Sequence, residues 1–171
     1  FKYLCEKGYL NVAKWLYALD GVNIHAYDDW VFCCACYNGH LEVADWLYSL
    51  SGVNIHARGG DAFRYACKNG HLSIAKWLYS LGGVDIHTND DWAFRWACHN
   101  GHLEVADWLY SLGGVDIHAG GDWAFRLACY NGHLEVAQWL YSLGGVDIHK
   151  YNDWAFRYVC KEGHLLIAQW L

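Results

Sequence analysis

A dipeptide that recurs at a constant interval is the feature that most constrains this chain. Gly-His begins at residues 39, 70, 101, 132 and 163, and Gly8-Tyr9 stands one interval earlier, so the sequence repeats every 31 residues without a slip. A period of about 20–50 residues is typical of solenoids, in which each unit buries its apolar face only against its neighbours. We therefore predict one elongated domain, residues 1–171, with a partial unit 1–28, four units 29–59, 60–90, 91–121 and 122–152, and a partial unit 153–171.

The composition indicates an ordered protein that folds in water. Hydrophobic residues make up 55% of the chain and charged residues 18%, which is enough for a continuous core and too apolar for a disordered chain. No run of about 18 apolar residues is present, so we expect no membrane partner. The net charge is −6, and the lysines and arginines are scattered singly along the sequence. Both observations argue against a nucleic-acid partner, which requires a clustered basic stripe.

Eight cysteines invite a disulfide interpretation, but their spacing argues against it. Six of them occupy one place in the repeat: Cys5, Cys36, Cys67, Cys98, Cys129 and Cys160. Stacked helices lie about 8–10 Å apart, whereas a disulfide needs Cα atoms within about 7 Å. We expect reduced thiols, which suits the cytoplasm, and the nucleus is equally compatible.

Residues 91–121 illustrate one unit. Asp91 is predicted to cap a helix over residues 92–100, in which Phe94, Ala97 and Cys98 form one buried stripe before Gly101 ends it. A second helix is predicted from Leu103 to about Leu112. Residues 115–118 then alternate in polarity, which favours a short extended arm followed by a turn at residues 119–121.

This order of elements and its residues resemble the ankyrin repeat. The segment Asn100-Gly101-His102-Leu103-Glu104-Val105-Ala106 is similar to the ankyrin "NGHLEVV" turn, and Gly114-Val115-Asp116-Ile117-His118 is similar to "GADVN". The resemblance covers essentially the whole chain and implies an all-α ankyrin-repeat solenoid of stacked helix-turn-helix units with short connecting turns. Within the family, the segment Trp-Leu-Tyr-Ser-Leu-Gly-Gly-Val-Asp-Ile-His most resembles the large ankyrin arrays of giant DNA viruses of amoebae.

Two departures from the family pattern affect the interpretation. Where ankyrins open the first helix with Thr-Pro-Leu-His, this chain has Trp123-Ala124-Phe125-Arg126 and its equivalents, so the hydroxyl-to-imidazole hydrogen bond of that motif cannot form. The unit is also shorter than the usual ankyrin unit, with the loss in the turn after His118. We therefore expect no long protruding fingers.

Comparison of the copies separates scaffold from surface. Tryptophans such as Trp77 and Trp108 recur in every copy, so we assign them to packing. Two places in the first helix vary and lie opposite the buried stripe, and the resemblance implies that they and the turn tips line a concave groove that binds partners. The predicted partner-binding residues are Tyr37, Lys68, His99, Tyr130 and Lys161, with Tyr65 and Trp96 one turn earlier and Tyr27, Arg58, Asn89 and Tyr151 at the tips. The alternative is that the place of Trp96 is half covered by the neighbouring unit and that of His99 merely tolerates change.

The sequence offers few signs of metal or catalytic chemistry. Cys98 and His102 are four residues apart in a pattern that recurs in five copies, but Gly101 separates them and zinc needs four converging ligands. A His-x-Glu match to zinc deaminases lacks its Pro-Cys-x-x-Cys half, because the chain contains no proline. The Cys-x-x-Cys of residues 33–36 lies inside a helix, so we interpret it as an oxidation-sensitive spot rather than a redox centre. We expect no cofactor, no small-molecule substrate and no enzyme activity.

The sequence thus predicts a non-catalytic module that binds an unidentified protein through its concave face. A structural spacer in a longer array is an alternative, because the copies are nearly identical. Leu166 replaces the Glu of other copies on the last helix, and we expect from this that the chain is a fragment of such an array. The resemblance also allows the substrate-recruiting part of a ubiquitin-ligase adaptor.

Overall fold

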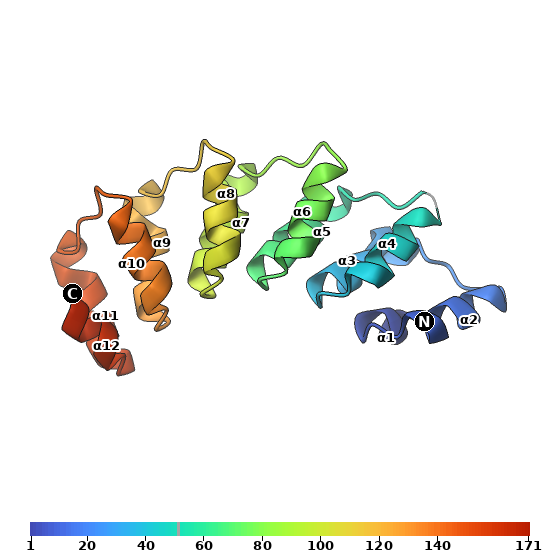
Figure 1. Cartoon of the computed structure of the whole chain (residues 1–171), viewed down its shortest axis with the longest axis horizontal. Helices are drawn as coiled ribbons and strands as arrows, with labels where there is room; N and C mark the ends of the chain where they lie inside the picture. Colours follow the sequence, from blue (N-terminus) through green and yellow to red (C-terminus); the bar gives the residue numbers. More distant parts are fainter. Residues whose placement is uncertain (51) are drawn as a thin grey trace. The chain divides into compact units, whose positions relative to one another are not determined.

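The computed structural model describes residues 1–50 and 52–171, and these residues form helices and turns without a strand (Figure 1). The chain divides into two compact units, unit 1 (Phe1–Asp85) and unit 2 (Ile86–Leu171), which are described separately. Among the described residues, no helix has both the length and the apolar character needed to cross a membrane. The single array of residues 1–171 stays a prediction.

Each unit contains three helix pairs, in which a first helix is followed by a second helix of the same copy. In unit 1 the pairs are α1 (Lys2–Glu6) with α2 (Leu10–Ala18), α3 (Ala26–Tyr37) with α4 (Leu41–Ser49), and α5 (Ala57–Lys68) with α6 (Leu72–Ser80). In unit 2 they are α7 (Thr88–His99) with α8 (Leu103–Ser111), α9 (Ala119–Tyr130) with α10 (Leu134–Ser142), and α11 (Lys150–Glu162) with α12 (Leu165–Trp170). The stacked helix-turn-helix architecture is confirmed. The extended arm predicted at residues 115–118 is wrong in its second half, because residues 117 and 118 form a turn and His118 has helical backbone angles, whereas residues 115 and 116 have no regular structure.

The Gly-His dipeptide joins neighbouring copies. Gly101 adopts φ +80°, and a Cβ built on it would lie 2.5 Å from Nδ1 of His133 in the next copy. The histidine uses its other ring nitrogen on the backbone of the preceding copy: Nε2 of His40 donates to the carbonyl oxygen of Glu6 at 2.9 Å, and His164 does the same to Tyr130. This histidine therefore bonds the backbone, and the 31-residue period follows from a contact between copies.

The recurring aromatic side chains form the second contact between copies. Phe32, Phe94 and Phe125 are 1% exposed. Each packs on a half-buried tryptophan in the second helix of the next copy, as Phe125 does on Trp170 with ring centroids 6.2 Å apart. The same tryptophan meets a tyrosine of the preceding second helix edge-on, as in the pair of Tyr141 and Trp170 at 5.5 Å. The assignment of these tryptophans to packing is confirmed inside each unit. Trp15 of α2 differs from the others, because it is 62% exposed.

The cysteines are small apolar groups of this core. All eight are free thiols, and seven are buried while Cys160 is exposed. Burial raises the pKa of the Cys5 thiol to about 11 and that of Cys129 to about 12. Burial, aided by the negative charge of Asp61, also raises the pKa of Cys33 to about 12. The expectation of an oxidation-sensitive spot at residues 33–36 is wrong at Cys33, because a buried thiol that stays protonated is a poor nucleophile.

Candidate partner-binding face

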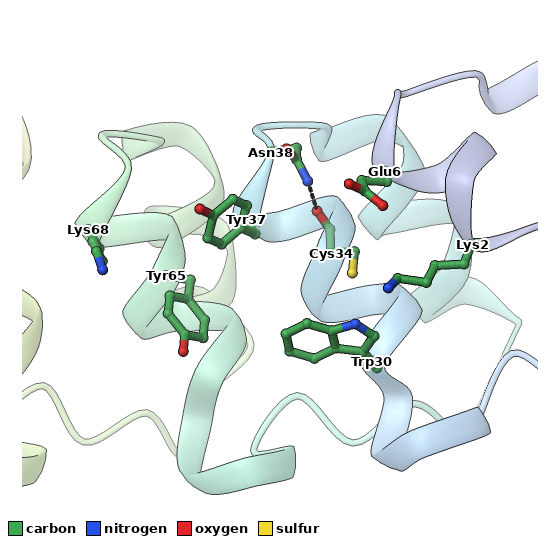
Figure 2. A pocket seen from close by; sticks show the side chains of 8 residues that line it. All are labelled: Lys2, Glu6, Trp30, Cys34, Tyr37, Asn38, Tyr65 and Lys68. Atoms are coloured by element: carbon green, nitrogen blue, oxygen red, sulfur yellow. Dashed lines mark hydrogen bonds between the residues drawn. The ribbon is translucent and has the colours of Figure 1, made fainter.

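The first helices of unit 1 enclose a groove of about 380 Å³ (Figure 2). Residues of α1, α3 and α5 and the turn after α3 line it: Lys2, Glu6, Trp30, Cys34, Tyr37, Asn38, Tyr65 and Lys68. Three of these, Tyr37, Tyr65 and Lys68, belong to the predicted set. We call the surface of the first helices and their turns the first-helix face, and we describe it for each unit in turn.

The groove lies where one copy has a small side chain. Cys34 occupies the place that Tyr3, Tyr65, Trp96, Leu127 and Tyr158 fill in other copies. Its thiol is 6% exposed, and the hollow lies in front of it between the rings of Trp30, Tyr37 and Tyr65. The substitution of a thiol for a bulky ring therefore accounts for the open space at this copy.

The walls of the groove are held by specific contacts. The rings of Tyr37 and Tyr65 meet edge-on with centroids 5.6 Å apart, and the Asn38 side chain donates to the carbonyl oxygen of Cys34 at 2.8 Å. Nζ of Lys2 lies 5.8 Å from the ring centroid of Trp30, and the guanidinium carbon of Arg58 lies 4.9 Å from it. These distances are within the range of cation–π attraction, which orders the charged groups at the groove edge.

In unit 2 the corresponding face is filled by two aromatic clusters. In the first, the ring of Trp96 lies 4.5 Å from His99, 5.5 Å from Trp92 and 6.4 Å from Trp123 of the next copy. The guanidinium carbon of Arg95 is 5.3 Å from the ring of Trp123. The half-buried state of Trp96 and His99 follows from this contact between copies, as the alternative in the sequence analysis anticipated for Trp96.

The second cluster joins α9 and α11. The ring of Tyr130 lies 6.1 Å from Trp154 and 6.0 Å from Tyr158, and these two rings stack at 4.3 Å. Arg126 lies 4.7 Å from the ring of Tyr151. Lys161 reaches over Tyr158 at 5.5 Å. The structure thus brings Tyr130 and Lys161 to one surface in unit 2.

The turn tips adopt an unexpected conformation. Near its start, each of the five long first helices contains three consecutive residues with φ between +55° and +80°. These residues are 27–29, 58–60, 89–91, 120–122 and 151–153, so they include the predicted tip residues Tyr27, Arg58, Asn89 and Tyr151. Tyr27 is 84% exposed and Tyr151 57%. Left-handed backbone costs about 1–2 kcal/mol for a residue other than glycine, so other contacts have to hold these turns.

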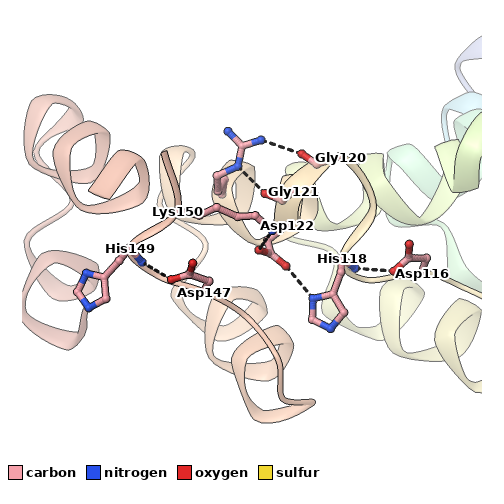
Figure 3. A network of polar contacts seen from close by, with 9 residues as sticks. Asp116, His118, Gly120, Gly121, Asp122, Asp147, His149 and Lys150 are labelled. Atoms are coloured by element: carbon pink, nitrogen blue, oxygen red, sulfur yellow. Dashed lines mark hydrogen bonds and ion pairs between the residues drawn. The ribbon is translucent and has the colours of Figure 1, made fainter. Parts of the chain in front are cut away.

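An aspartate at the end of the turn provides one of these contacts. Nδ1 of His118 donates to Asp122 at 2.7 Å, and the other carboxylate oxygen accepts from Nζ of Lys150 at 3.0 Å (Figure 3). The pairs His25 with Asp29, His87 with Asp91, and His149 with Asp153 repeat the first contact at 2.6–2.7 Å. The predicted helix cap at Asp91 is wrong, because its carboxylate bonds His87 and, at 3.3 Å, the backbone N–H of Asp116 after the second helix of the same copy, instead of its own helix.

An arginine provides the other contact. Nη2 of Arg95 donates to the carbonyl oxygen of Asn89 at 2.7 Å, and Arg126 donates to the carbonyl oxygens of Gly120 and Gly121 at 3.1 and 3.0 Å. In the copy that lacks the His–Asp spacing, Arg58 and Arg64 both bond Asp61. The turn is therefore tied to the helix that follows it, which fixes where the tip side chains stand.

These observations agree with the comparison to known protein families. The family model described as Ankyrin repeats (3 copies) matches residues 1–90, 63–153 and 94–171. The chain belongs to the ankyrin-repeat family. Members of this family are generally protein–protein interaction modules and typically non-catalytic. A search among curated proteins finds no match.

The ankyrin-repeat chain also carries surface residues that the sequence analysis missed. Trp30, Trp92, Trp123 and Trp154 are half-buried on the first-helix face, next to the predicted residues. The signal was present, because residues 92, 96 and 99 have the i, i+4, i+7 spacing of one helix side. The stripe around Phe94 orients the helix toward the core, whereas the ring contacts of the second stripe involve the neighbouring copy.

Within the part of this ankyrin-repeat chain that the structure describes, no three His, Cys, Asp or Glu side chains come close enough to hold a metal ion. Cys98 is buried, whereas His102 stands at the start of α8. The pair therefore lies in two different environments.

Proposed function

We propose that this ankyrin-repeat chain is a non-catalytic module that binds a protein partner through its first-helix face, the concave face of the predicted array. The observation that carries the proposal is the groove of unit 1, where rings of Trp30, Tyr37 and Tyr65 are held in place yet remain accessible. Tyrosine, tryptophan and arginine dominate the energetics of protein interfaces, because they bring large contact area at a small loss of side-chain entropy.

The accessibility of these rings supports a partner rather than further packing. Tyr37 is 45% exposed although its ring touches Tyr65, whereas Phe32 of the same helix is 1% exposed. The clusters around Trp96 and Trp154 place partly exposed rings on the first helices of unit 2 as well. A set of ordered, partly exposed aromatic side chains is typical of an interaction surface.

Affinity capture from a cell extract tests the proposal. The wild-type chain is compared with a face variant, in which Tyr37, Tyr65, His99 and Tyr130 are all Ala, and with a control variant that has Ala at Glu42, Glu104 and Glu135 on the second helices. Circular dichroism verifies that both variants fold. We expect partners that bind wild type and control and are lost from the face variant, and equal capture by all three proteins would refute the proposal.

The contacts that recur between copies, which we call the frame, favour a structural spacer as a second candidate function. The same Gly-His and Phe–Trp contacts recur in successive copies, so the length of the chain is set by the number of copies. A spacer is sensitive to deletion of residues 122–152, one complete copy, and insensitive to the face variant. Recruitment of substrates for ubiquitin ligation and membership of the giant-virus arrays stay predictions of the resemblance. A cytoplasmic site stays a prediction from the spacing of the cysteines.

A further inference from the structure

We infer that the unit 1 groove binds an acidic peptide segment, in which carboxylates flank a bulky apolar side chain. This inference rests on the proposed function, because it names the chemistry of the partner for that same face. The observation behind it is that positive and negative side chains lie on different helices, although the net charge of the chain is −6.

Positive charge is concentrated on the first helices. In unit 1 these helices and their caps carry five of the seven lysines and arginines: Lys2, Lys7, Arg58, Arg64 and Lys68. In unit 2 they carry all five: Arg95, Arg126, Lys150, Arg157 and Lys161. The residues are scattered singly in the sequence, but the helical fold gathers them on one kind of element. The basic residues are therefore clustered on the folded surface although they are scattered in the sequence.

Four of the nine acidic groups of the same helices are turned inward: Asp29, Asp61, Asp91 and Asp122. Asp29 and Asp61 are 6% exposed, and Asp29 accepts hydrogen bonds from the imidazole of His25 and the backbone N–H of Asn54. The carboxylate of Asp61 is bonded by Arg58 and Arg64. Their negative charge is thus compensated inside the turns. At the groove itself, two lysines, Lys2 and Lys68, face a single acid, Glu6.

The second helices and connecting arms have the opposite balance. In unit 2 they carry Glu104, Asp107, Asp116, Glu135 and Asp147 and neither lysine nor arginine. In unit 1 they carry Asp20, Glu42, Asp45 and Asp85 against Lys14 and Lys76. An acidic partner is repelled by these surfaces and attracted to the first helices, and such complementarity raises the association rate and excludes other orientations.

The arrangement of the groove defines the peptide further. Lys2 and Lys68 stand at its two ends, and the rings of Trp30, Tyr37 and Tyr65 lie between them (Figure 2). The space in front of Cys34 accepts an apolar side chain between these rings, while a carboxylate on each side reaches a lysine. Rings with nearby cations also suit single-stranded nucleic acid, but Glu6 at the groove and the acidic arms favour a peptide over a phosphate chain.

The test is a selection of short random peptides displayed on phage against four folded forms of the whole chain. Wild type is compared with a groove charge reversal, Lys2→Glu with Lys68→Glu, and with a matched control, Lys14→Glu with Lys76→Glu. The control makes the same change in net charge on exposed positions of α2 and α6. A fourth form, Tyr37→Ala with Tyr65→Ala, removes the rings. The best peptide is then labelled with fluorescein, and its affinity is measured by fluorescence anisotropy at low and high salt.

We expect wild type and the matched control to select peptides rich in Asp and Glu around an apolar residue. The groove charge reversal should weaken the best peptide by about tenfold or more, and salt should weaken its binding to wild type. Neutral or basic peptides that still require Tyr37 and Tyr65 would overturn this inference and leave the proposed function standing. Selected peptides whose binding is unchanged by the loss of both rings would count against the proposed function itself. Displacement of the labelled peptide by a thymidine oligonucleotide at lower concentration than by unlabelled peptide would assign the groove to nucleic acid instead.

Discussion

The residues that recur in every copy and the residues that vary between copies have different surroundings. Recurring residues such as Phe125, Gly101 and His133 contact the neighbouring copy and are buried or closely packed. Varying residues such as Cys34, Tyr65 and Trp96 lie on the first-helix face, where one copy leaves a groove and another completes an aromatic cluster. The difference indicates that the recurring residues of the frame determine the stability of the fold, whereas the residues of the first-helix face can vary without loss of the fold. Substitutions in the frame should cost free energy of unfolding, and those on the face should alter binding.

The largest loss is expected from the core ring of the frame. Phe125→Ala removes a side chain that is 1% exposed and packs on Trp170, so it should lower the free energy of unfolding by about 3–5 kcal/mol. The matched position one copy later, Phe156, is 46% exposed. Phe156→Ala should therefore cost much less. Urea unfolding followed by circular dichroism measures both, and equal losses would show that the contact with the next copy is not what stabilises this ring.

The frame was predictable from the sequence because its contacts repeat. Every copy must bury the same stripe against its neighbour, so the demand on Phe94 and its equivalents appears at intervals of 31 residues. The ends of the two helices in each copy followed from the same regularity. A contact made by one copy alone leaves no such periodic trace.

The glycine of the Gly-His turn gives the next largest effect. Gly101→Ala places a Cβ 2.5 Å from His133 and a residue other than glycine at φ +80°, so we expect a loss of about 3 kcal/mol. Gly163 has almost the same φ, +79°, but a Cβ on it would have no neighbour within 4 Å. Gly163→Ala should then show the backbone cost alone, about 1–2 kcal/mol. Similar losses for the two variants in thermal unfolding would mean that the histidine moves aside freely.

The aspartate of the left-handed turn should produce a smaller loss that depends on pH. Burial raises the pKa of Asp122, but hydrogen bonds from His118 and Lys150 outweigh burial and lower this pKa below its ordinary value of 3.8. The carboxylate therefore stabilises the folded state above about pH 4, and this contribution is lost as the pH falls below that value. Asp122→Asn should cost about 2 kcal/mol at neutral pH and make unfolding less sensitive to acid below about pH 4.

Asp153 provides the comparison for this prediction, because its side chain is 54% exposed. The hydrogen bond that His149 donates to the carboxylate of Asp153 raises the pKa of His149, so Asp153→Asn should lower that pKa in a nuclear magnetic resonance titration. Its effect on the free energy of unfolding should be smaller than that of Asp122→Asn. Equal acid sensitivity of wild type and Asp122→Asn would show that the buried carboxylate is not the group that titrates.

Physical reasons explain why the conformation of the turn and the position of the groove could not be predicted from the sequence. Asp91 stands just before an apolar helix, where an N-cap and a partner for a histidine four residues earlier are both chemically reasonable. The choice depends on the left-handed backbone of residues 89–91, where the carboxylate of Asp91 bonds His87 and the backbone N–H of Asp116. The groove depends on how Cys34 is flanked by rings from α3 and α5, and a helical wheel of one copy does not contain those neighbours.

Replacing Cys34 should have the smallest effect on stability and still change the face. Cys34→Tyr gives this copy the residue that Tyr65 and Tyr158 supply elsewhere, and its ring enters an open groove rather than a packed core. We expect the free energy of unfolding to change by less than about 1 kcal/mol. The affinity for a peptide selected on wild type should fall by about tenfold or more, because the added ring occupies the space between Trp30, Tyr37 and Tyr65.

Cys34→Ser keeps the groove open and should retain the peptide. A Cys34→Tyr chain that binds the peptide as well as wild type would place the binding surface outside this groove, whereas a large loss of stability would mean that Cys34 belongs to the frame.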